Sequence, residues 1–202
     1  MTLFADSMQG VQRGLHSSAI AILQEMLLRT YNEDYLELQT PPLEPVLIGV
    51  LTSVIHYSDA EHFWPLLEVI MEAIKSRASD KRYLGLSSRL LFIVCGVRKG
   101  SRVANWPLVL ETTSLVARNC DDSVGLEATR IREFLSTLSV VFQYCPIDVA
   151  IPHTQILEKV SKGSLEPYFL SFSNMFAHIG QERFSTLILP YFKRSVVYTS
   201  CR

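Results

Sequence analysis

The densest group of side chains with binding chemistry is the basic stretch Arg98-Lys99-Gly100-Ser101-Arg102. Guanidinium and ammonium groups donate charge-assisted hydrogen bonds, and phosphate or carboxylate oxygens are the acceptors they prefer. With a glycine and a serine inside it, the stretch is expected to form a donor-rich loop that contacts nucleic-acid phosphates or an acidic protein. Lys81 and Arg82 form a second basic pair that could join this contact. The candidate contact residues are therefore Lys81, Arg82, Arg98, Lys99 and Arg102.

The charge pattern leaves an alternative role for these basic residues. Residues 75–102 hold eight basic residues and one acidic residue, whereas residues 1–74 hold two basic and ten acidic residues. The basic side chains could serve solubility alone, or pair within the chain with an acidic cluster made of Glu33, Asp34, Glu37 and Glu44. A phosphate contact predicts an affinity that falls steeply with salt concentration, whereas the alternative predicts a flat response.

Most aromatic residues lie at the spacing expected of a helical core. Base stacking requires exposed rings beside basic residues. In the sequence only Tyr83, which follows Lys81 and Arg82, meets that description. We therefore expect Tyr83 to be exposed and the remaining aromatic residues to be buried.

No stretch of the sequence predicts catalysis or a metal site. The segment His56–His62 holds two histidines and two carboxylates, but it crosses a helix break, so a polar turn in which Asp59 caps the next helix is the preferred interpretation. The motifs of serine hydrolases, phosphate-binding loops, dinucleotide folds and zinc proteases are all missing from the sequence. We expect no enzyme activity, no cofactor, no metal and no small-molecule substrate.

Composition predicts a folded protein outside the membrane. Of the 202 residues, 48% are hydrophobic and 19% are charged, which is too apolar for a disordered chain. The longest apolar run, residues 90–97, is far shorter than the roughly 20 residues that span a bilayer, and no secretory signal is evident. The four cysteines are widely spaced, as in reduced intracellular proteins, and Cys95 is expected to be a buried thiol.

Apolar residues recur every three or four positions between proline and glycine breaks, which predicts an all-α protein. Asn105 is expected to cap one helix, with Pro107 in its first turn. The second helix is expected to turn Val46, among others, inward. The expected helices cover residues 15–31, 43–56, 60–76, 83–97, 106–118, 123–143, 153–161, 165–179 and 181–196. The inward residues expected on the third helix are Phe63, Leu66, Leu67, Ile70, Met71 and Ile74.

The helix starts recur every 40 to 47 residues, which is the period of HEAT and armadillo repeats. Trp64-Pro65 and Trp106-Pro107 lie 42 residues apart, each expected in the first turn of a helix. We predict a single solenoid segment of about four helix pairs over residues 1–202, with an ordinary antiparallel bundle as the alternative. Because both ends are apolar, the chain is expected to be a fragment of a longer repeat protein and to aggregate in isolation.

Three stretches carry a resemblance to a known family: Phe63-Trp64-Pro65-Leu66, Leu90–Val94 continuing into Val97–Val103, and Trp106. Together they resemble the N-terminal half of the very large HEAT-repeat scaffold of the small-subunit processome, the family also called down-regulated in metastasis. This resemblance implies a protein of the nucleus and nucleolus that supports pre-rRNA processing. Its implied partners are proteins and pre-ribosomal or small nucleolar RNA, and the family has no catalytic residues to carry over.

The function expected from sequence is therefore a non-catalytic interaction scaffold in ribosome small-subunit assembly. One alternative is a HEAT-type scaffold that binds protein cargo in nuclear transport or trafficking. A remote alternative is an all-α enzyme, which would require a concave pocket with convergent polar groups.

Overall fold

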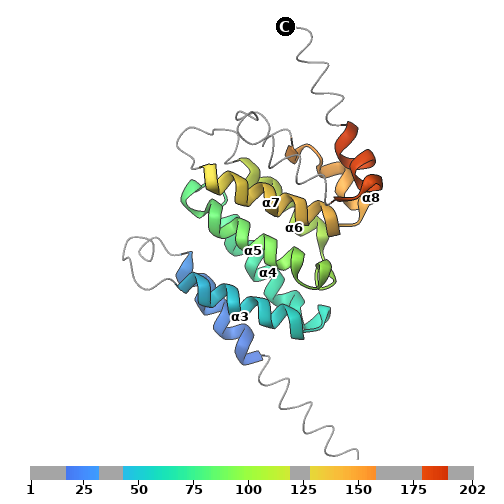
Figure 1. The fold of residues 1–202 in the computed structure, drawn as a ribbon. Coiled ribbons are helices and arrows are strands. Elements are labelled where there is room, and N and C mark those ends of the chain that lie inside the picture. The colour runs from blue at the N-terminus through green and yellow to red at the C-terminus, as the bar shows by residue number, and fades with distance from the viewer. Residues whose placement is uncertain (1–16, 32–42, 119–127, 158–178, 191–202) are drawn as a thin grey trace, which may run out of the picture.

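A computed structural model describes residues 17–31, 43–118, 128–157 and 179–190, and all regular secondary structure in these ranges is helical (Figure 1). The prediction of an all-α protein is confirmed. In the described part, no helix is long and apolar enough to cross a membrane. After a helix over residues 17–30, the elements are α3 (Leu43–Tyr57), α4 (Ala60–Ser76), η1 (Lys81–Tyr83), α5 (Leu84–Gly96), η2 (Val97–Gly100), α6 (Trp106–Ala117), α7 (Ala128–Tyr144), α8 (Ile147–Ala150), η4 (Ile151–His153), α11 (Gln181–Arg183) and the π-helical turn η6 (Phe184–Ile188).

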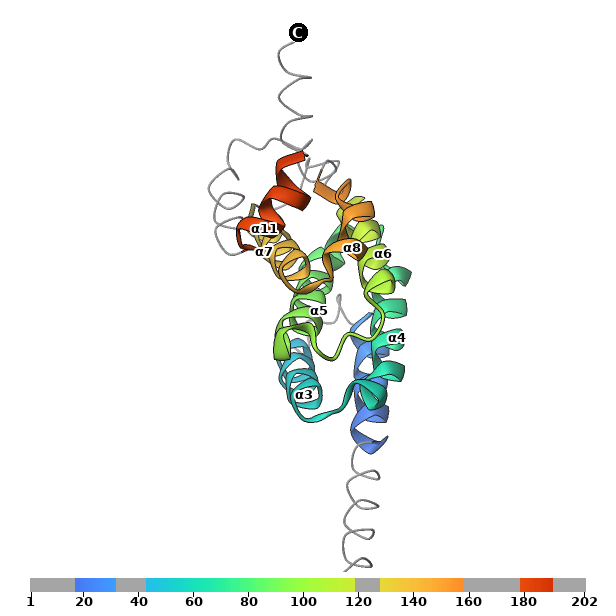
Figure 2. The ribbon, with the colours of Figure 1, turned by 90° about the vertical axis from the view of Figure 1, so that its right-hand side faces the viewer.

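The helices are arranged in two layers. Figure 2 shows α3, α5 and α7 stacked in one column and α4, α6 and α8 in the other. Within the first layer α5 packs against both α3 and α7, and within the second α6 packs against α4 and α8. Successive helices therefore alternate between the layers, and each helix pair lies on the pair before it.

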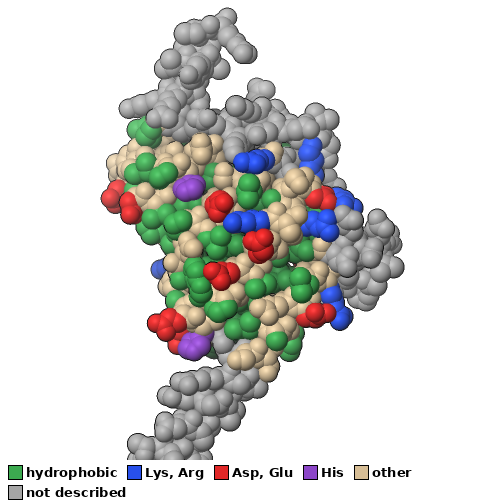
Figure 3. All heavy atoms as spheres, turned by 180° about the vertical axis from the view of Figure 1, so that it is seen from behind, with side chains coloured by type: hydrophobic (Ala, Val, Ile, Leu, Met, Phe, Trp, Pro, Cys, Tyr) green, Lys and Arg blue, Asp and Glu red, His purple; other side chains and the backbone are tan. Residues whose placement is uncertain are grey.

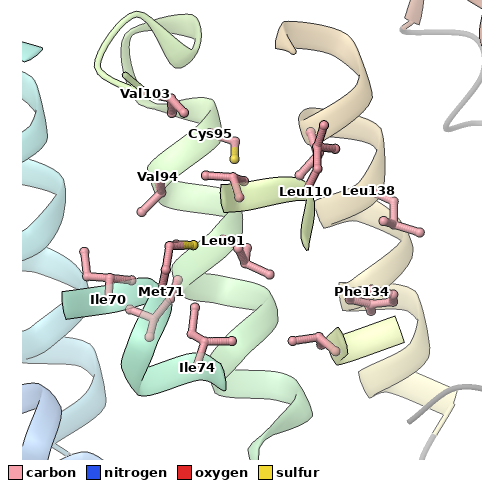
Figure 4. Packing of buried hydrophobic residues seen from close by; sticks show 14 of the residues in the cluster. Ile70, Met71, Ile74, Leu91, Val94, Cys95, Val103, Leu110, Phe134 and Leu138 are labelled. Atoms are coloured by element: carbon pink, nitrogen blue, oxygen red, sulfur yellow. The ribbon is translucent and has the colours of Figure 1, made fainter. Parts of the chain in front are cut away.

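Buried side chains from four helices meet between these layers (Figure 4). Every residue expected to face inward on the third helix is buried in α4, because the 3.6-residue period places them on one face. The prediction for Val46 is wrong, since its side chain on α3 is 55% exposed. Cys95 is fully buried, as expected.

Helix starts follow the sequence in part. The Asn105 side chain accepts a hydrogen bond from the backbone N–H of Leu108 at 3.1 Å, and Pro107 lies in the first turn of α6, as expected. Asp59 occupies the position before α4 with extended backbone, but its side chain makes no capping hydrogen bond to the described residues. The expected cap is therefore wrong. Its carboxylate lies 4.0 Å from both His62 Nδ1 and Arg102 Nη1 instead.

Two expectations about the repeat register are also corrected. Trp106 and Pro107 open α6, but Pro65 lies inside α4 beyond its first turn, so the two Trp-Pro pairs do not occupy equivalent positions. The next helical turn begins at Ile147, directly after Pro146, rather than near His153. The helix expected over residues 165–179 lies outside the described residues except at its last position.

A charge network links α3, α5 and α7, three helices of the first layer. The Arg89 guanidinium on α5 pairs with the Glu44 carboxylate on α3 and, at 3.1 Å, with that of Glu133 on α7. These residues are 45 and 44 positions apart in the sequence, which matches the period of the helix starts. The network connects adjacent helices of the layer side by side.

We expect Arg89→Met to lower the free energy of unfolding by about 1 kcal/mol, because two carboxylates lose their shared cation at a partly exposed site. Urea unfolding followed by circular dichroism measures this, and 1 M NaCl should shrink the difference by screening. Arg29→Met is the matched control, since Arg29 pairs with Glu25 only one turn away on an exposed face and should cost less than about 0.5 kcal/mol. Equal losses for the two variants would contradict an inter-helix role for Arg89.

Candidate functional site

The five candidate contact residues lie at opposite ends of α5. Lys81 and Arg82 belong to η1, which precedes α5, whereas Arg98, Lys99 and Arg102 follow it. A helix of 13 residues is about 20 Å long at a rise of 1.5 Å per residue. The structure therefore separates these residues into two groups, and no small ligand could contact both.

The group before α5 is committed to contacts within the chain. Arg82 donates from Nη2 to Asp80 Oδ2 at 2.7 Å and from Nε to both carboxylate oxygens at 3.1 Å. This side-chain hydrogen bond lowers the pKa of Asp80. The Lys81 carbonyl accepts a hydrogen bond from Arg130 at 3.4 Å. These contacts lie within the chain, but neither Asp80 nor Arg130 belongs to the acidic cluster expected from the sequence. Of the described basic block, Arg89 pairs with one member of that cluster, Glu44.

Tyr83 is not the exposed ring that the sequence predicted. Its side chain is 1% exposed and stacks on Tyr31, with ring centroids 5.1 Å apart. The guanidinium of Arg77 lies 5.8 Å from the centre of the Tyr83 ring. The prediction failed because basic neighbours in the sequence do not determine whether a ring is exposed. The Tyr83 ring is buried because Tyr31 stacks on it.

The group after α5 is carried by a turn with unusual backbone geometry. Arg98 and Lys99 both have φ of 55°, and Gly100 follows with φ of 70°, so three successive residues are left-handed. Gly100 is buried, and a Cβ at this position would lie 2.7 Å from Trp106 Cζ2. The close approach of the backbone to the indole requires glycine and fixes the turn on α6.

Arg98 and Lys99 are exposed on this turn; the Arg98 carbonyl accepts a hydrogen bond from the Ser101 N–H at 3.2 Å, but neither side chain forms a hydrogen bond or an ion pair with another described residue. Arg102 differs from them, because its side chain is 17% exposed and its Nη1 lies 4.0 Å from Asp59 Oδ1. The Nε of Arg102 is buried without a hydrogen-bond partner in the described structure. The three cations thus share one turn, and two of them are available to a ligand.

The stacking of the layers adds two residues that sequence analysis missed. The C-terminal end of α3 lies beside η2 in both ribbon views (Figures 1 and 2). Tyr57, the last residue of α3, is 85% exposed, and its ring meets that of His56 edge-to-face at 4.9 Å. No motif in the sequence links Tyr57 to the basic stretch, which begins 41 residues later. We call His56, Tyr57, Arg98, Lys99 and Arg102 together the basic edge.

The remaining chemistry of the described residues is sparse. No group of three or more His, Cys, Asp or Glu in the described ranges could hold a metal ion. A depression of about 410 Å³ lies on the helix over residues 17–30, and its charged members Glu25 and Arg29 pair with each other at 2.8 Å. These residues come from one helix and do not converge on a common point.

The thiols of Cys95 and Cys145 are buried, and burial raises the pKa of Cys145 to about 12 and raises that of Cys95 as well. We expect a Cys120→Ser/Cys201→Ser variant to react with a thiol reagent at pH 8 at least 100-fold more slowly when folded than in urea, where the thiol pKa returns to about 8.5. Because the raised pKa values favour the protonated thiols in the folded state, stability should fall as pH rises above about 8.5. Equal labelling rates in the two states would contradict this packing.

Comparisons with protein families, with curated proteins and with solved structures give no match for this chain. The function must therefore be argued from the residues of this chain and from the sequence resemblance described above. Among the described residues, the basic edge is the candidate contact surface for a partner.

Proposed function

We propose that the chain is a non-catalytic helical-repeat scaffold of the HEAT or armadillo type that binds macromolecular partners. The arrangement of three successive helix pairs in two layers supports the repeat architecture. The Glu44–Arg89–Glu133 network supports it independently, because its members lie 45 and 44 residues apart on α3, α5 and α7, close to the period of the helix starts. Repeats of this kind present extended surfaces rather than an enclosed catalytic pocket.

The shifted pKa values in the described structure have structural causes, which supports a role without catalysis. Burial raises the pKa values of Tyr31, Cys95 and Cys145, and a hydrogen bond from Arg82 lowers that of Asp80. None of these four residues lines the depression on the helix over residues 17–30. Catalytic groups with shifted pKa values are expected to face a cleft instead.

We place this scaffold in ribosome small-subunit assembly, in the nucleolus, on the basis of the sequence resemblance. One structural observation supports the assignment: the stretch that carries the resemblance, Val97–Val103 with Trp106, is the turn that presents Arg98 and Lys99. The residues that resemble the family thus include an exposed turn, which carries Arg98 and Lys99, and the Trp106 ring against which that turn packs.

The test is purification of the tagged protein from cells after ultraviolet cross-linking. We expect it to sediment with small-subunit precursor particles and to recover precursor rRNA or small nucleolar RNA above an untagged control. Recovery of transport factors and cargo proteins without these particles would reject the ribosomal assignment and favour the transport scaffold. Turnover of a substrate by the purified chain would reject the non-catalytic role.

A further inference from the structure

We propose that the basic edge binds single-stranded nucleic acid, with one base stacked on Tyr57 and neighbouring phosphates bound by Arg98 and Lys99. This inference rests on the non-catalytic scaffold proposed above and adds the class of ligand and the residues that bind it. It does not depend on the assignment to ribosome assembly.

The first support is that the two exposed cations are held in place. Arg98 and Lys99 both adopt left-handed backbone conformations, which are unfavourable for residues other than glycine. Gly100 holds the turn against Trp106, and its ideal Cβ would also lie 3.1 Å from Tyr144 Cβ on α7. Solubility alone would not require charges on a strained and anchored turn, whereas a binding site benefits from donors whose position is already fixed.

Arg102 supplies a further donor beside this turn. Its guanidinium lies 4.0 Å from the Asp59 carboxylate, which is longer than a hydrogen bond, and Nε has no acceptor among the described residues. The described residues therefore do not saturate the Arg102 guanidinium. A phosphate bound by Arg98 and Lys99 would lie on the same turn as the Arg102 guanidinium. The positive charge of Arg102 would then add to the attraction between the basic edge and the phosphate.

The second support is an exposed aromatic ring at the end of α3, the helix that packs against η2. Tyr57 is 85% exposed, and His56, itself exposed, contacts its ring edge-to-face. An edge-to-face contact covers at most one face of a ring, so His56 leaves at least one face of the Tyr57 ring uncovered. Stacking of a base on an aromatic ring stabilises a complex and tolerates every base, because each base has a π-face.

The surroundings of the edge favour a single strand over other ligands. A duplex keeps its bases stacked on each other and offers no face to Tyr57, and an acidic protein would use the cations without needing the ring. The adjacent face over α4 exposes the carboxylates of Glu61, Glu68 and Glu72 (Figure 3). These carboxylates would repel phosphates, which confines a nucleic acid to the edge. With few cations, the expected dissociation constant is on the order of 10⁻⁵ M at physiological salt.

The experiment measures binding of a fluorescein-labelled 12-nucleotide single-stranded RNA to the full chain by fluorescence anisotropy, between 50 and 200 mM KCl. Arg98→Gln/Lys99→Gln should weaken binding at least tenfold at 50 mM KCl and reduce the slope of log Kd against log salt by about 1.4, for two phosphates at about 0.7 each. Tyr57→Ala should weaken binding at least fivefold at an unchanged slope, whereas Tyr57→Phe should bind normally. Arg118→Gln, at the exposed C-terminal end of α6, is the control and should change neither quantity.

Distinct outcomes would overturn the inference. A Tyr57→Ala variant that binds as well as the unaltered chain would remove the stacking, and equal affinity for a duplex of the same sequence would remove the preference for single strands. Stronger binding of an oligoglutamate peptide than of RNA would assign the edge to an acidic protein. Circular dichroism confirms that each variant is folded. Because the scaffold proposal is tested by particles recovered from cells, it can stand when this in vitro binding fails.

Discussion

Gly100→Ala is expected to lower the free energy of unfolding by about 3 kcal/mol, which combines the left-handed backbone with overpacking. Gly100 has φ of +70° and is buried, and the added Cβ would lie 2.7 Å from Trp106 Cζ2 and 3.1 Å from Tyr144 Cβ. The indole is itself held in the first turn of α6, between the layers, so it has little room to move away. Relief would require η2 to separate from α6 and α7.

Gly49→Ala is the matched control for this substitution. Gly49 lies in the interior of α3, and a Cβ built there meets no heavy atom of the described structure within 4 Å. Alanine is the better helix former, so this variant should gain about 0.5–1 kcal/mol. Urea unfolding of both variants, followed by circular dichroism, gives the comparison. If Gly100→Ala proved as stable as Gly49→Ala, the turn would not be anchored on Trp106.

Gly100→Ala also tests whether the proposed RNA binding depends on the anchored turn. Because Gly100 fixes the turn that carries Arg98 and Lys99, Gly100→Ala should also weaken RNA binding at temperatures where the chain remains folded. A variant that loses stability but binds RNA normally would show that the two cations do not need a fixed turn. The anchor and the ligand contact are thus separable by experiment.

The sequence predicts helices and their inner faces well where the helices are long. In α4 the apolar period identifies the complete set of buried residues, because a helix covered on one side leaves its period in the sequence. On α3 the same reasoning fails for Val46, which has the right type and spacing but lies at the margin of the buried stripe. The apolar period shows which side of a helix is buried, but it does not show how far the neighbouring helices cover that side.

The candidate site is harder to predict, because its members come from different helix pairs. Proximity in sequence singled out Tyr83 for its basic neighbours, yet the structure buries Tyr83 beneath Tyr31. The most exposed ring in the described structure is Tyr57, some 40 residues before Arg98 in the sequence, and only the packing of α3 on η2 places it on the same side of the molecule as the turn. The charge count likewise could not separate Arg82 and Arg89, which are paired within the chain, from Arg98 and Lys99.

Phe134→Ala is expected to be the most damaging substitution in the core, with a loss of about 4 kcal/mol. Phe134 is fully buried on α7, which packs on α5 more extensively than any other pair of helices in the described structure. Figure 4 shows its ring among the side chains between the layers, near Leu138 of the same helix. Truncation to alanine removes the apolar contacts of the ring and leaves a cavity that the rigid helices cannot close.

Phe92→Ala provides the control, because it removes the same ring from α5 at a position that is 43% exposed, and it should cost less than about 1.5 kcal/mol. The shape of the unfolding curve carries a second result. In a repeat stack each pair is stabilised by its neighbours, so weakening the α5–α7 contact should broaden or split the transition as α7 unfolds before α3 and α4. A single sharp transition, with a free energy of unfolding lower by about 4 kcal/mol, would indicate one cooperative core, as in a bundle. A loss no larger than that of Phe92→Ala would contradict the packing of α7 on α5.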